Sequence, residues 1–440
     1  MFHFELFFSP TGIKFFYKLK QLRLPGRKWI FLVSKNRNKW LLFRIIAAKQ
    51  KTMKILFVID TYDTSNNGTS ISAQRFAAAL RKRGHEVKIL TSGEPDEYKF
   101  TVPNFTMPVF QPLMDKHDFD FAQFFGPEAM NVIKSAVEWA DIVHGFLPFA
   151  LEITAQRYAA KIGKPNTGAF HMQPENMTSS VGLGKVDVVN DWFYKVFRRE
   201  YYDRFRHVHC VSNFMADMIR SHGYKAKLHV ISNGIQEDFL EAGRRFIEEG
   251  RPEKTPELEG KMLITMVGRL SGEKRQDVII DAVPYSKYAD KIQLVFAGRG
   301  PKYDEYVKLG EKLPNKPMFV YLDKENLIHL LGMTDLYVHA SDMESEAISC
   351  IEAFATGLVP VIANSDVSAT PQFALDGRSL FMPGHPKDLA RAIDYWLDHP
   401  NERKYIGGLY HESAKKYTLE NSVSQFEEML LEEIADNKLS

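Results

Sequence analysis

Two carboxylates, Glu344 and Glu352, lie eight positions apart in a segment whose pattern changes from loop to helix. Apolar residues recur there at helical spacing, which predicts a helix from about Ala347 to Thr356. Gly357 follows where a left-handed cap would end that helix, and the apolar run 359–363 predicts a buried strand. Glu344 is therefore expected just before the helix N-terminus, with Glu352 a little over two turns further on, since about 3.6 residues make a turn.

This arrangement favours a ligand that carries phosphate and sugar hydroxyl groups. A helix N-terminus attracts phosphate because its first backbone N–H groups lack helical partners. Carboxylates accept hydrogen bonds from hydroxyl groups. The spacing alone is equally compatible with one solvated acid and one acid that caps the helix.

Further candidates follow other predicted strands. Arg269 and Lys274 come after the apolar run 261–267, where fixed cations could stabilise charge on a leaving phosphate group. His171 follows a run of small and apolar residues, and Gly68 would let the backbone approach a ligand closely. The ordinary alternatives are an exposed basic pair, a structural histidine and a turn glycine.

Strands and helices alternate from Met53 onward, which predicts an α/β fold of parallel sheets with helices on both faces. A charged linker, 248–260, divides the chain into two halves. In the first half we expect strands at 54–59, 86–91, 142–145, 207–211 and 228–231, and helices at 72–83, 133–140, 152–162 and 214–222. In the second half we expect strands at 261–267, 293–297, 318–321, 336–339 and 359–363.

Taken in order, these segments resemble the retaining, nucleotide-sugar-dependent glycosyltransferases of family four. The acid pair resembles the Glu-(seven residues)-Glu signature of that family, and the stretch His171–Asn176 looks most like its glycolipid-synthesising members. The other matching segments are Met53–Asp60, Asn66–Ser70, Val230–Ile235, Val267–Lys274 and Ala297–Pro301. The resemblance covers roughly residues 53–430.

The resemblance implies the GT-B fold, in which two Rossmann-like domains with parallel sheets face a central cleft. Residues 53–232 would form the first, acceptor-side domain, completed by a C-terminal helix at about 405–440. Residues 233–404 would form the second domain, which binds the nucleotide sugar. The helices expected at 386–397 and 419–434 would both cross back to the first domain.

The resemblance also implies roles for individual residues. Arg269 and Lys274 would contact the diphosphate, Glu344 a hydroxyl of the donor sugar, Glu352 the ribose, and His171 the transferred sugar. The rest of the nucleotide-sugar site would comprise Gly68, Gly268, Gly298 and the backbone near Ala347 and Ile348. No enzyme nucleophile is expected, because the leaving phosphate oxygen could take the acceptor proton, and no metal or other cofactor is expected.

The chain departs from the family pattern in two places. The family usually has two adjacent glycines where this chain has Gly68 alone. The Glu-Gly-Phe-Gly of the family is replaced by Glu344, Ser345, Glu346 and Ala347. The identity of the donor sugar therefore does not follow from the resemblance.

Composition fits an intracellular enzyme with two cores. The chain has 440 residues, 45% of them hydrophobic and 25% charged. Its two cysteines, Cys210 and Cys350, form neither a disulfide framework nor a zinc-ligand spacing, which favours a reducing compartment. Asp118-Phe119-Asp120 resembles a metal-binding motif of another glycosyltransferase fold, but no strand precedes it, and we expect solvated acids there.

Positive charge is concentrated at the start of the chain. Residues 1–52 hold 12 Lys and Arg residues against the single acid Glu5, a net +11, so the whole-chain charge of +2 leaves −9 for the remainder. This segment is also aromatic and lacks the ~18 uncharged apolar residues of a membrane span. It is either an interfacial anchor on anionic lipid or sequence upstream of a true start at Met53.

We therefore expect a cytoplasmic hexosyltransferase, peripheral on the inner face of the cell membrane. The expected donor is UDP-glucose or UDP-galactose, and the expected acceptor is a lipid such as diacylglycerol or ceramide, giving an alpha-glycolipid. The basic and aromatic segment 195–206 would then lie on the membrane, or else form an ordinary amphipathic helix. The alternatives are a polysaccharide, lipid-linked oligosaccharide or small soluble acceptor, another GT-B activity such as an epimerase or phosphorylase, or a non-catalytic sugar-binding module. No nucleic-acid partner is expected.

Overall fold

The structure is a computed structural model that describes residues 18–24, 28–36, 39–43, 52–63, 68–105, 121–179, 184 and 186–439. Residues Met1–Met53 and Lys54–Ser440 form two separate compact units. The Asp118-Phe119-Asp120 motif, together with Asn66 and Asn67, lies outside the described residues.

The described part of the N-terminal unit is an antiparallel sheet in the order β1 (Lys18–Leu24), β2 (Lys28–Asn36) and β3 (Lys39–Phe43). The sequence analysis predicts no strands there. β2 contains Trp, Ile, Phe, Leu and Val, most of which favour strands, but the interspersed basic residues obscure the pattern.

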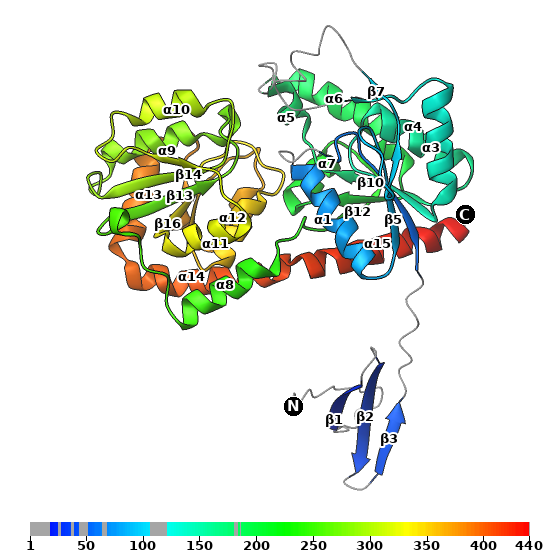
Figure 1. Cartoon of the computed structure of the whole chain (residues 1–440), viewed down its shortest axis with the longest axis horizontal. Helices are drawn as coiled ribbons and strands as arrows, with labels where there is room; N and C mark the ends of the chain where they lie inside the picture. The colour runs from blue at the N-terminus through cyan, green and yellow to red at the C-terminus, as the bar shows by residue number, and fades with distance from the viewer. Residues whose placement is uncertain are drawn as a thin grey trace. The chain divides into compact units, whose positions relative to one another are not determined.

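Seven of the described strands in the larger unit form a parallel sheet, in the order β12-β11-β10-β9-β4-β5-β6 (Figure 1). The strands are β4 (Lys54–Val58), β5 (Glu86–Thr91), β6 (Lys99–Thr101), β9 (Ile142–Gly145), β10 (Asn166–Phe170), β11 (His207–Cys210) and β12 (Lys227–Val230). The connecting helices are α1 (Gly68–Lys82), α3 (Pro127–Trp139), α4 (Ala150–Lys161), α5 (Pro174–Ser179), α6 (Asp187–Glu200) and α7 (Asn213–Ser221). A short antiparallel pair, β7 (Asn104–Phe105) and β8 (Phe121–Ala122), is separate from this sheet.

Six further described strands form a second parallel sheet, in the order β15-β14-β13-β16-β17-β18. These strands are β13 (Met262–Val267), β14 (Ile292–Ala297), β15 (Met318–Val320), β16 (Leu336–His339), β17 (Pro360–Ala363) and β18 (Leu380–Phe381). The helices around them are α8 (Glu237–Glu248), α9 (Gln276–Ala282), α10 (Tyr303–Gly310), α11 (Lys324–Met333) and α12 (Ile348–Ala355). Two parallel sheets with alternating helices confirm the predicted fold class.

The last helices follow a different path from the predicted one. The expectation that residues 386–397 cross back to the first domain is wrong, because α13 (Pro386–Asp398) packs on α9 in the second half. Its buried Leu389, Ile393 and Trp396 form the apolar face of that contact. α14 (Pro400–Ala414) also stays in the second half, against α12 and α8.

The chain returns to the first half at α15 (Leu419–Leu439), which packs on α1, β10 and β11 (Figure 1). The return therefore comes later than the predicted boundary at about 405. Among the described residues, no helix is long and apolar enough to cross a membrane.

Strand order determines where ligands can bind. In the first sheet the order reverses between β4 and β9, and in the second between β13 and β16. In open parallel sheets the crevice at such a reversal lies at the carboxyl ends of the strands and is where ligands bind. The segments after these four strands are therefore the first place to look for a site.

Candidate active site

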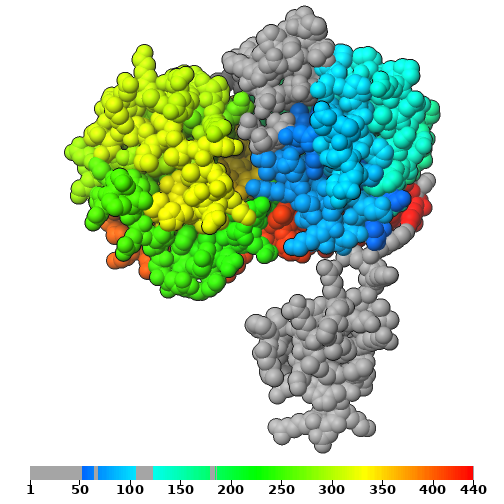
Figure 2. All heavy atoms as spheres, in the orientation of Figure 1, coloured from blue at the N-terminus to red at the C-terminus, as the bar shows by residue number. Residues whose placement is uncertain are grey.

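A cleft of about 1160 Å³ is lined by both halves, largely by segments that follow their strands. Figure 2 shows the surface hollowed where the two halves meet. The first half contributes Gly68, Leu147 and His171 among others, and the second half contributes the segments after β13 and β16. This volume is slightly above the roughly 300–1,000 Å³ of a typical small-molecule pocket, so the cleft can hold a large ligand.

Two cations enter the cleft from the segment after β13. Arg269 and Lys274 both line it, and Lys274 ends a 3-10 turn, Gly272–Lys274. Arg275 adopts the left-handed conformation, with φ 56°, and its Nη1 lies 3.0 Å from Oδ2 of Asp342. This pair joins the segment after β13 to the segment after β16. Among the described residues, no acid pairs with Arg269, so its guanidinium is available to an anionic ligand.

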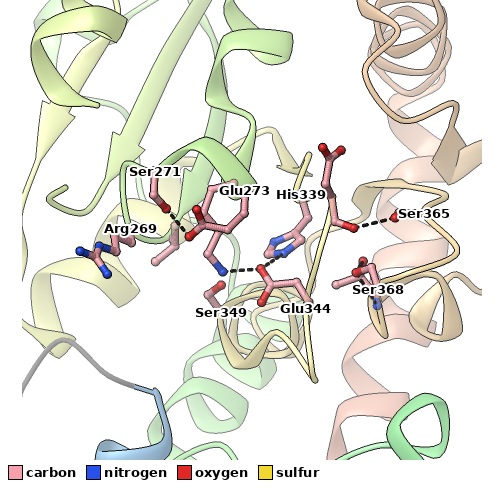
Figure 3. Close-up of polar contacts among 12 residues, drawn as sticks. Arg269, Ser271, Glu273, His339, Glu344, Ser349, Ser365 and Ser368 are labelled. Carbon is pink, nitrogen blue, oxygen red and sulfur yellow. Dashed lines mark hydrogen bonds and ion pairs between the residues drawn. The ribbon is translucent and has the colours of Figure 1, made fainter. Parts of the chain in front are cut away.

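Glu344 lies at the centre of a buried network (Figure 3). Its Oε1 accepts from Lys274 Nζ at 2.5 Å and lies 2.9 Å from Nε2 of His339, the last residue of β16. The side chain of Glu344 is nearly buried, at 9% exposure, and lines the cleft. Since both contacts are to Oε1, Oε2 can accept from a ligand hydroxyl group.

The network keeps Glu344 ionised. Burial alone would raise its pKa, but the charge of Lys274 and the hydrogen bond from His339 outweigh burial, so the pKa of Glu344 lies well below its usual range. A permanently ionised carboxylate can accept hydrogen bonds from sugar hydroxyls without first losing a proton. The expected placement of Glu344 and Lys274 in one site is what the structure shows.

The N-terminus of α12 opens into the same cleft. Ala347, Ile348 and Ser349 line it, and backbone N–H groups at a helix start are free to bind an anion. Ala347 adopts the left-handed conformation with φ 69°, which costs a residue with a Cβ roughly 1–2 kcal/mol. Ala347 stands where the resembled family has the second glycine of its Glu-Gly-Phe-Gly segment, and that glycine would carry this conformation without strain.

Glu352, on α12, faces a residue that the sequence analysis missed. Arg75 of α1 places its Nη2 3.5 Å from Oε1 of Glu352, and both side chains line the cleft. Burial raises the pKa of Glu352, while Arg75 opposes that effect. The pair joins the two halves, so a ligand that binds Glu352 also comes within reach of Arg75.

Arg75 could have been found from its spacing. The helix begins at Gly68, four residues before the predicted start, so Gly68, Ile71 and Arg75 lie on one helical face at spacings of three and four. All three line the cleft. The sequence analysis predicted a helix that starts at Ser72, so it did not show that Arg75 shares a helical face with Gly68 and Ile71.

A second set of contacts between the halves lies beside the acid pair. The carboxylate of Glu346 accepts from the backbone N–H of Asn233 at 2.9 Å and from its side-chain amide at 2.7 Å. Ser212 Oγ donates to the carbonyl of Ser345 at 2.7 Å. Burial raises the pKa of Glu346 to about 7. The Glu346 side chain, which stands where the family has phenylalanine, and the Ser345 carbonyl therefore hold the two halves together.

His171 forms part of the opposite wall. It lines the cleft directly after β10, stacks on Phe146 with ring centroids 5.4 Å apart, and meets His209 edge-on at 5.1 Å. Burial and the neighbouring His209 hold the pKa of His171 well below its usual value, so the ring is neutral. Its Nε2 is buried and has no partner among the described residues, so a ligand would reach this nitrogen only after a local shift of the side chains around it.

The predicted glycines divide into two groups. Gly68 and Gly268 line the cleft. Gly298 is not among the residues that line it, and a Cβ there would lie 2.0 Å from the carbonyl oxygen of Gly268. Gly298 thus lets the turn after β14 pack against the Gly268 segment, and its contribution to the site is indirect.

The family comparisons divide the chain in the same way as the two sheets. The family described as Glycosyltransferase Family 4 matches residues 66–239, and Glycosyl transferases group 1 matches residues 248–408. The chain is 24% identical over 322 residues to the alpha-monoglucosyldiacylglycerol synthase of Streptococcus pneumoniae, covering 71% of each chain. It is also 24% identical over 325 residues to the GDP-mannose-dependent alpha-mannosyltransferase of Mycolicibacterium smegmatis, covering 71% of this chain and 79% of the relative.

One of the solved structures similar to this chain shares its architecture. Anabaena HepE in complex with UDP and glucose has a TM-score of 0.62 at 17% identity, covering 86% of this chain and 99% of that one. The catalytic domain of cholesterol-alpha-glucosyltransferase from Helicobacter pylori is 48% identical, with a TM-score of 0.35, covering 36% of this chain and 99% of that one. The structural likeness to HepE shows the fold.

Proposed function

We propose that this chain transfers a hexose from a nucleotide sugar to a lipid with retention of configuration. The premise is that the chain belongs to the glycosyltransferases that join a family 4 domain to a group 1 domain. The donor in this proposal is UDP-glucose or UDP-galactose, and the acceptor is a diacylglycerol- or ceramide-like lipid. The observation that carries the proposal is the charged wall built by Arg269, Lys274 and Glu344 beside the N-terminus of α12.

This wall is suited to a nucleotide sugar. Arg269 and Lys274, which line the cleft, would bind the diphosphate together with the N–H groups of Ile348 and Ser349. Glu344 Oε2 would accept from a hydroxyl of the sugar, and Glu352 would accept from the ribose. The cations would stabilise the negative charge that develops on the leaving diphosphate as the bond breaks, and so would favour the transition state over the bound donor.

The proposed step needs no nucleophile from the protein. The bond between the anomeric carbon and the diphosphate oxygen breaks, and the acceptor hydroxyl oxygen bonds to that carbon on the same face. The hydroxyl proton passes to the departing phosphate oxygen, so atoms and charge balance. His171, neutral and close to the acceptor side, would orient the transferred sugar by a hydrogen bond.

A lipid acceptor is supported by the relative named for diacylglycerol and by the surface of the first half. On α6, which packs on α5, Val188 and Trp192 are 79% and 58% exposed, and Lys195 and Arg199 continue the same helical face. The exposed apolar pair lies beside Asp187 and Asp191 and is followed by the basic residues, and this basic end of the helix would face an anionic membrane surface. Asn176 of α5 lines the cleft, so a lipid held at α6 would have its headgroup close to the donor.

The proposal includes a peripheral location on the cytoplasmic face of the membrane. Both cysteines, Cys210 and Cys350, are buried and unpaired, which fits a reducing compartment. The basic segment 1–52 would add attraction to anionic lipid.

The decisive experiment is a donor-by-acceptor screen with the full chain. UDP-glucose, UDP-galactose, UDP-N-acetylglucosamine and GDP-mannose are each offered with diacylglycerol, ceramide or cholesterol in mixed micelles, and the products are identified by mass spectrometry. We expect one UDP-hexose to give a glycolipid whose anomeric proton coupling, by NMR, is that of the alpha form. A beta product would contradict retention, and a product from GDP-mannose alone would contradict the donor. Turnover of donor with no lipid product would move the acceptor to a soluble sugar or a polysaccharide.

A further inference from the structure

A cluster of ionisable side chains that do not line the cleft lies where strand β11 of the first sheet begins. His207 begins β11, His229 lies on the neighbouring strand β12, and Glu432 and Asp436 lie one turn apart on α15. Because the cleft lies at the carboxyl ends of the strands, a residue that begins a strand is at the other edge. Figure 1 shows the C-terminal end of α15 against the first half, on the side away from the second half.

Two imidazole nitrogens in this cluster face each other. His207 Nδ1 lies 2.8 Å from His229 Nε2. His207 pairs in register with Lys227, which is two positions before His229, and side chains two positions apart on a strand share a face. The two histidines therefore project from the same face of the sheet. Oε2 of Glu432 lies 3.9 Å from the same His229 nitrogen. One ligand atom from each of these three residues falls within 4.8 Å of the other two.

The other nitrogen of His207 is already oriented. Its Nε2 lies 3.0 Å from Oδ2 of Asp436, so the ring donates there and directs the lone pair of Nδ1 toward His229. A carboxylate behind a histidine is the arrangement that fixes the tautomer of a metal-ligating imidazole. Lys227 contacts the other oxygen of Glu432, which leaves Oε2 for the cluster.

We propose that His207, His229 and Glu432 bind one divalent transition-metal ion, for which zinc is the best chemical match. Neutral imidazole and carboxylate are ligands that zinc accepts, and its tetrahedral bonds of about 2.0–2.1 Å place ligand atoms roughly 3.3 Å apart. His229 Nε2 lies 2.8 Å from His207 Nδ1 and 3.9 Å from Glu432 Oε2, so one separation is shorter and the other longer than that value. When the metal binds, it replaces the proton that lies between the two rings. That proton moves to His229 Nδ1 or to solvent.

The ion would act on structure, since the cluster does not line the cleft. Two ligands come from adjacent strands and one from α15, so the ion would clamp the C-terminal helix to the first sheet. A ligand that binds the folded state alone stabilises it. The melting temperature should therefore rise with added zinc, while turnover stays unchanged.

The test uses the full chain without a polyhistidine tag, dialysed against a chelator. Zinc is titrated in competition with a chromophoric chelator, and cobalt is added in parallel to record its visible absorption. We expect one ion per chain and the intense cobalt spectrum of a four-coordinate site. His229→Gln and Glu432→Gln should each weaken zinc binding at least tenfold and abolish the zinc-dependent rise in melting temperature. Both residues are partly exposed, so these variants avoid the buried His207.

Matched controls are His329→Gln and Glu428→Gln, which change an exposed histidine of α11 and an exposed acid one turn before Glu432. Both should bind zinc like the parent chain. Asp436→Asn should weaken binding by roughly tenfold or more if it orients His207. Binding that is equal in the parent and in His229→Gln, or no binding by the parent at micromolar zinc, would overturn the proposal and leave a plain hydrogen bond between the rings.

Discussion

The two walls of the cleft are built on different principles. The second half presents ionised groups held by one another: Lys274, Glu344 and His339 form a buried network whose carboxylate has a pKa well below its usual range. The first half contributes one cation, Arg75, but around His171 it presents neutral groups: the ring stacks on Phe146, meets His209 edge-on, and has its pKa lowered mainly by burial. Burial favours the neutral form of both side chains. At Glu344 the charge of Lys274 and the hydrogen bond from His339 overcome this effect, whereas at His171 nothing opposes it. A charged, prearranged wall suits a diphosphate, whereas a neutral wall suits an acceptor hydroxyl that keeps its proton until the bond forms.

Removing a cation from the charged wall should have the largest effect. Lys274→Met keeps the length of the side chain, removes charge from the leaving group and leaves Glu344 without its ion pair. We expect kcat/KM to fall by roughly 10²–10³, as when one electrostatic contact to a transition state is lost. Initial rates with the donor found in the screen measure this, and Lys308→Met, exposed on α10 and away from the cleft, should leave rates unchanged. A Lys274→Met enzyme within threefold of the parent would remove Lys274 from the mechanism.

The wall that contains His171 should make the stability of the fold sensitive to acid. His209 lies behind His171, and burial lowers its pKa to about 4 despite a hydrogen bond to the carbonyl of Ile231. The unfolded chain binds this proton below pH 6.5 and the folded chain does not until about pH 4, so stability is lost as pH falls through that window. The loss from this group reaches about 3 kcal/mol.

His209→Gln removes that titration while keeping a donor for Ile231. Urea unfolding at pH 7.5 and pH 4.5 should show a smaller loss of stability on acidification in the variant than in the parent, whatever the variant does to stability at pH 7.5. An identical pH dependence in the two proteins would contradict a buried, neutral His209.

The ion pair that joins the walls should give an intermediate effect. Glu352→Gln should lower kcat/KM about tenfold, mainly by raising the KM for the donor, because a charge-assisted hydrogen bond contributes roughly 1.5–3 kcal/mol. Arg75→Met should act in the same direction. If the two side chains act together, the double variant will cost less than the sum of the single effects. Strictly additive effects would mean that the contact between α1 and α12 does not matter for donor binding.

A substitution on the exposed face of α6 should have the smallest effect. Trp192→Ala should reduce binding to anionic vesicles a few-fold and leave hydrolysis of the nucleotide sugar in the absence of lipid unchanged, because Trp192 is exposed on α6 and does not line the cleft. The matched variant Tyr405→Ala changes an equally prominent aromatic residue on α14, which belongs to the second half. Equal losses in both variants, measured by vesicle sedimentation, would remove α6 as the membrane-facing element.

The sequence predicted what depends on local pattern. The apolar runs that became β4, β13 and β16 were recognisable because strands buried on both faces are continuously apolar. Glu344 and Lys274 follow two of those strands, so their meeting was predictable from topology. The course of α13 was not, because its apolar stripe fits either half and packing on α9 decides between them.

The residues that were missed owe their positions to tertiary contacts. His339 ends a strand like many structural histidines, and its importance comes from the Glu344 oxygen 2.9 Å away. Glu346 looks like a surface acid in sequence, yet it is 3% exposed and holds Asn233. Alanine itself gives no sequence signal for a left-handed conformation, so at Ala347 only the glycine that the resembled family has there pointed to it.

The two connections between the halves lie side by side. Ile235, on the way out of the first half, forms a parallel bridge with Thr418, on the way back, through Ile235 N to Tyr417 O at 2.8 Å and Leu419 N to Ile235 O at 2.9 Å. Gly234 lets them approach, since a Cβ there would lie 2.7 Å from the Cα of Leu419. Both crossings therefore share one hinge line. A change in the angle between the halves would therefore either preserve this backbone bridge or break its two hydrogen bonds, and it would alter the Arg75–Glu352 contact across the cleft.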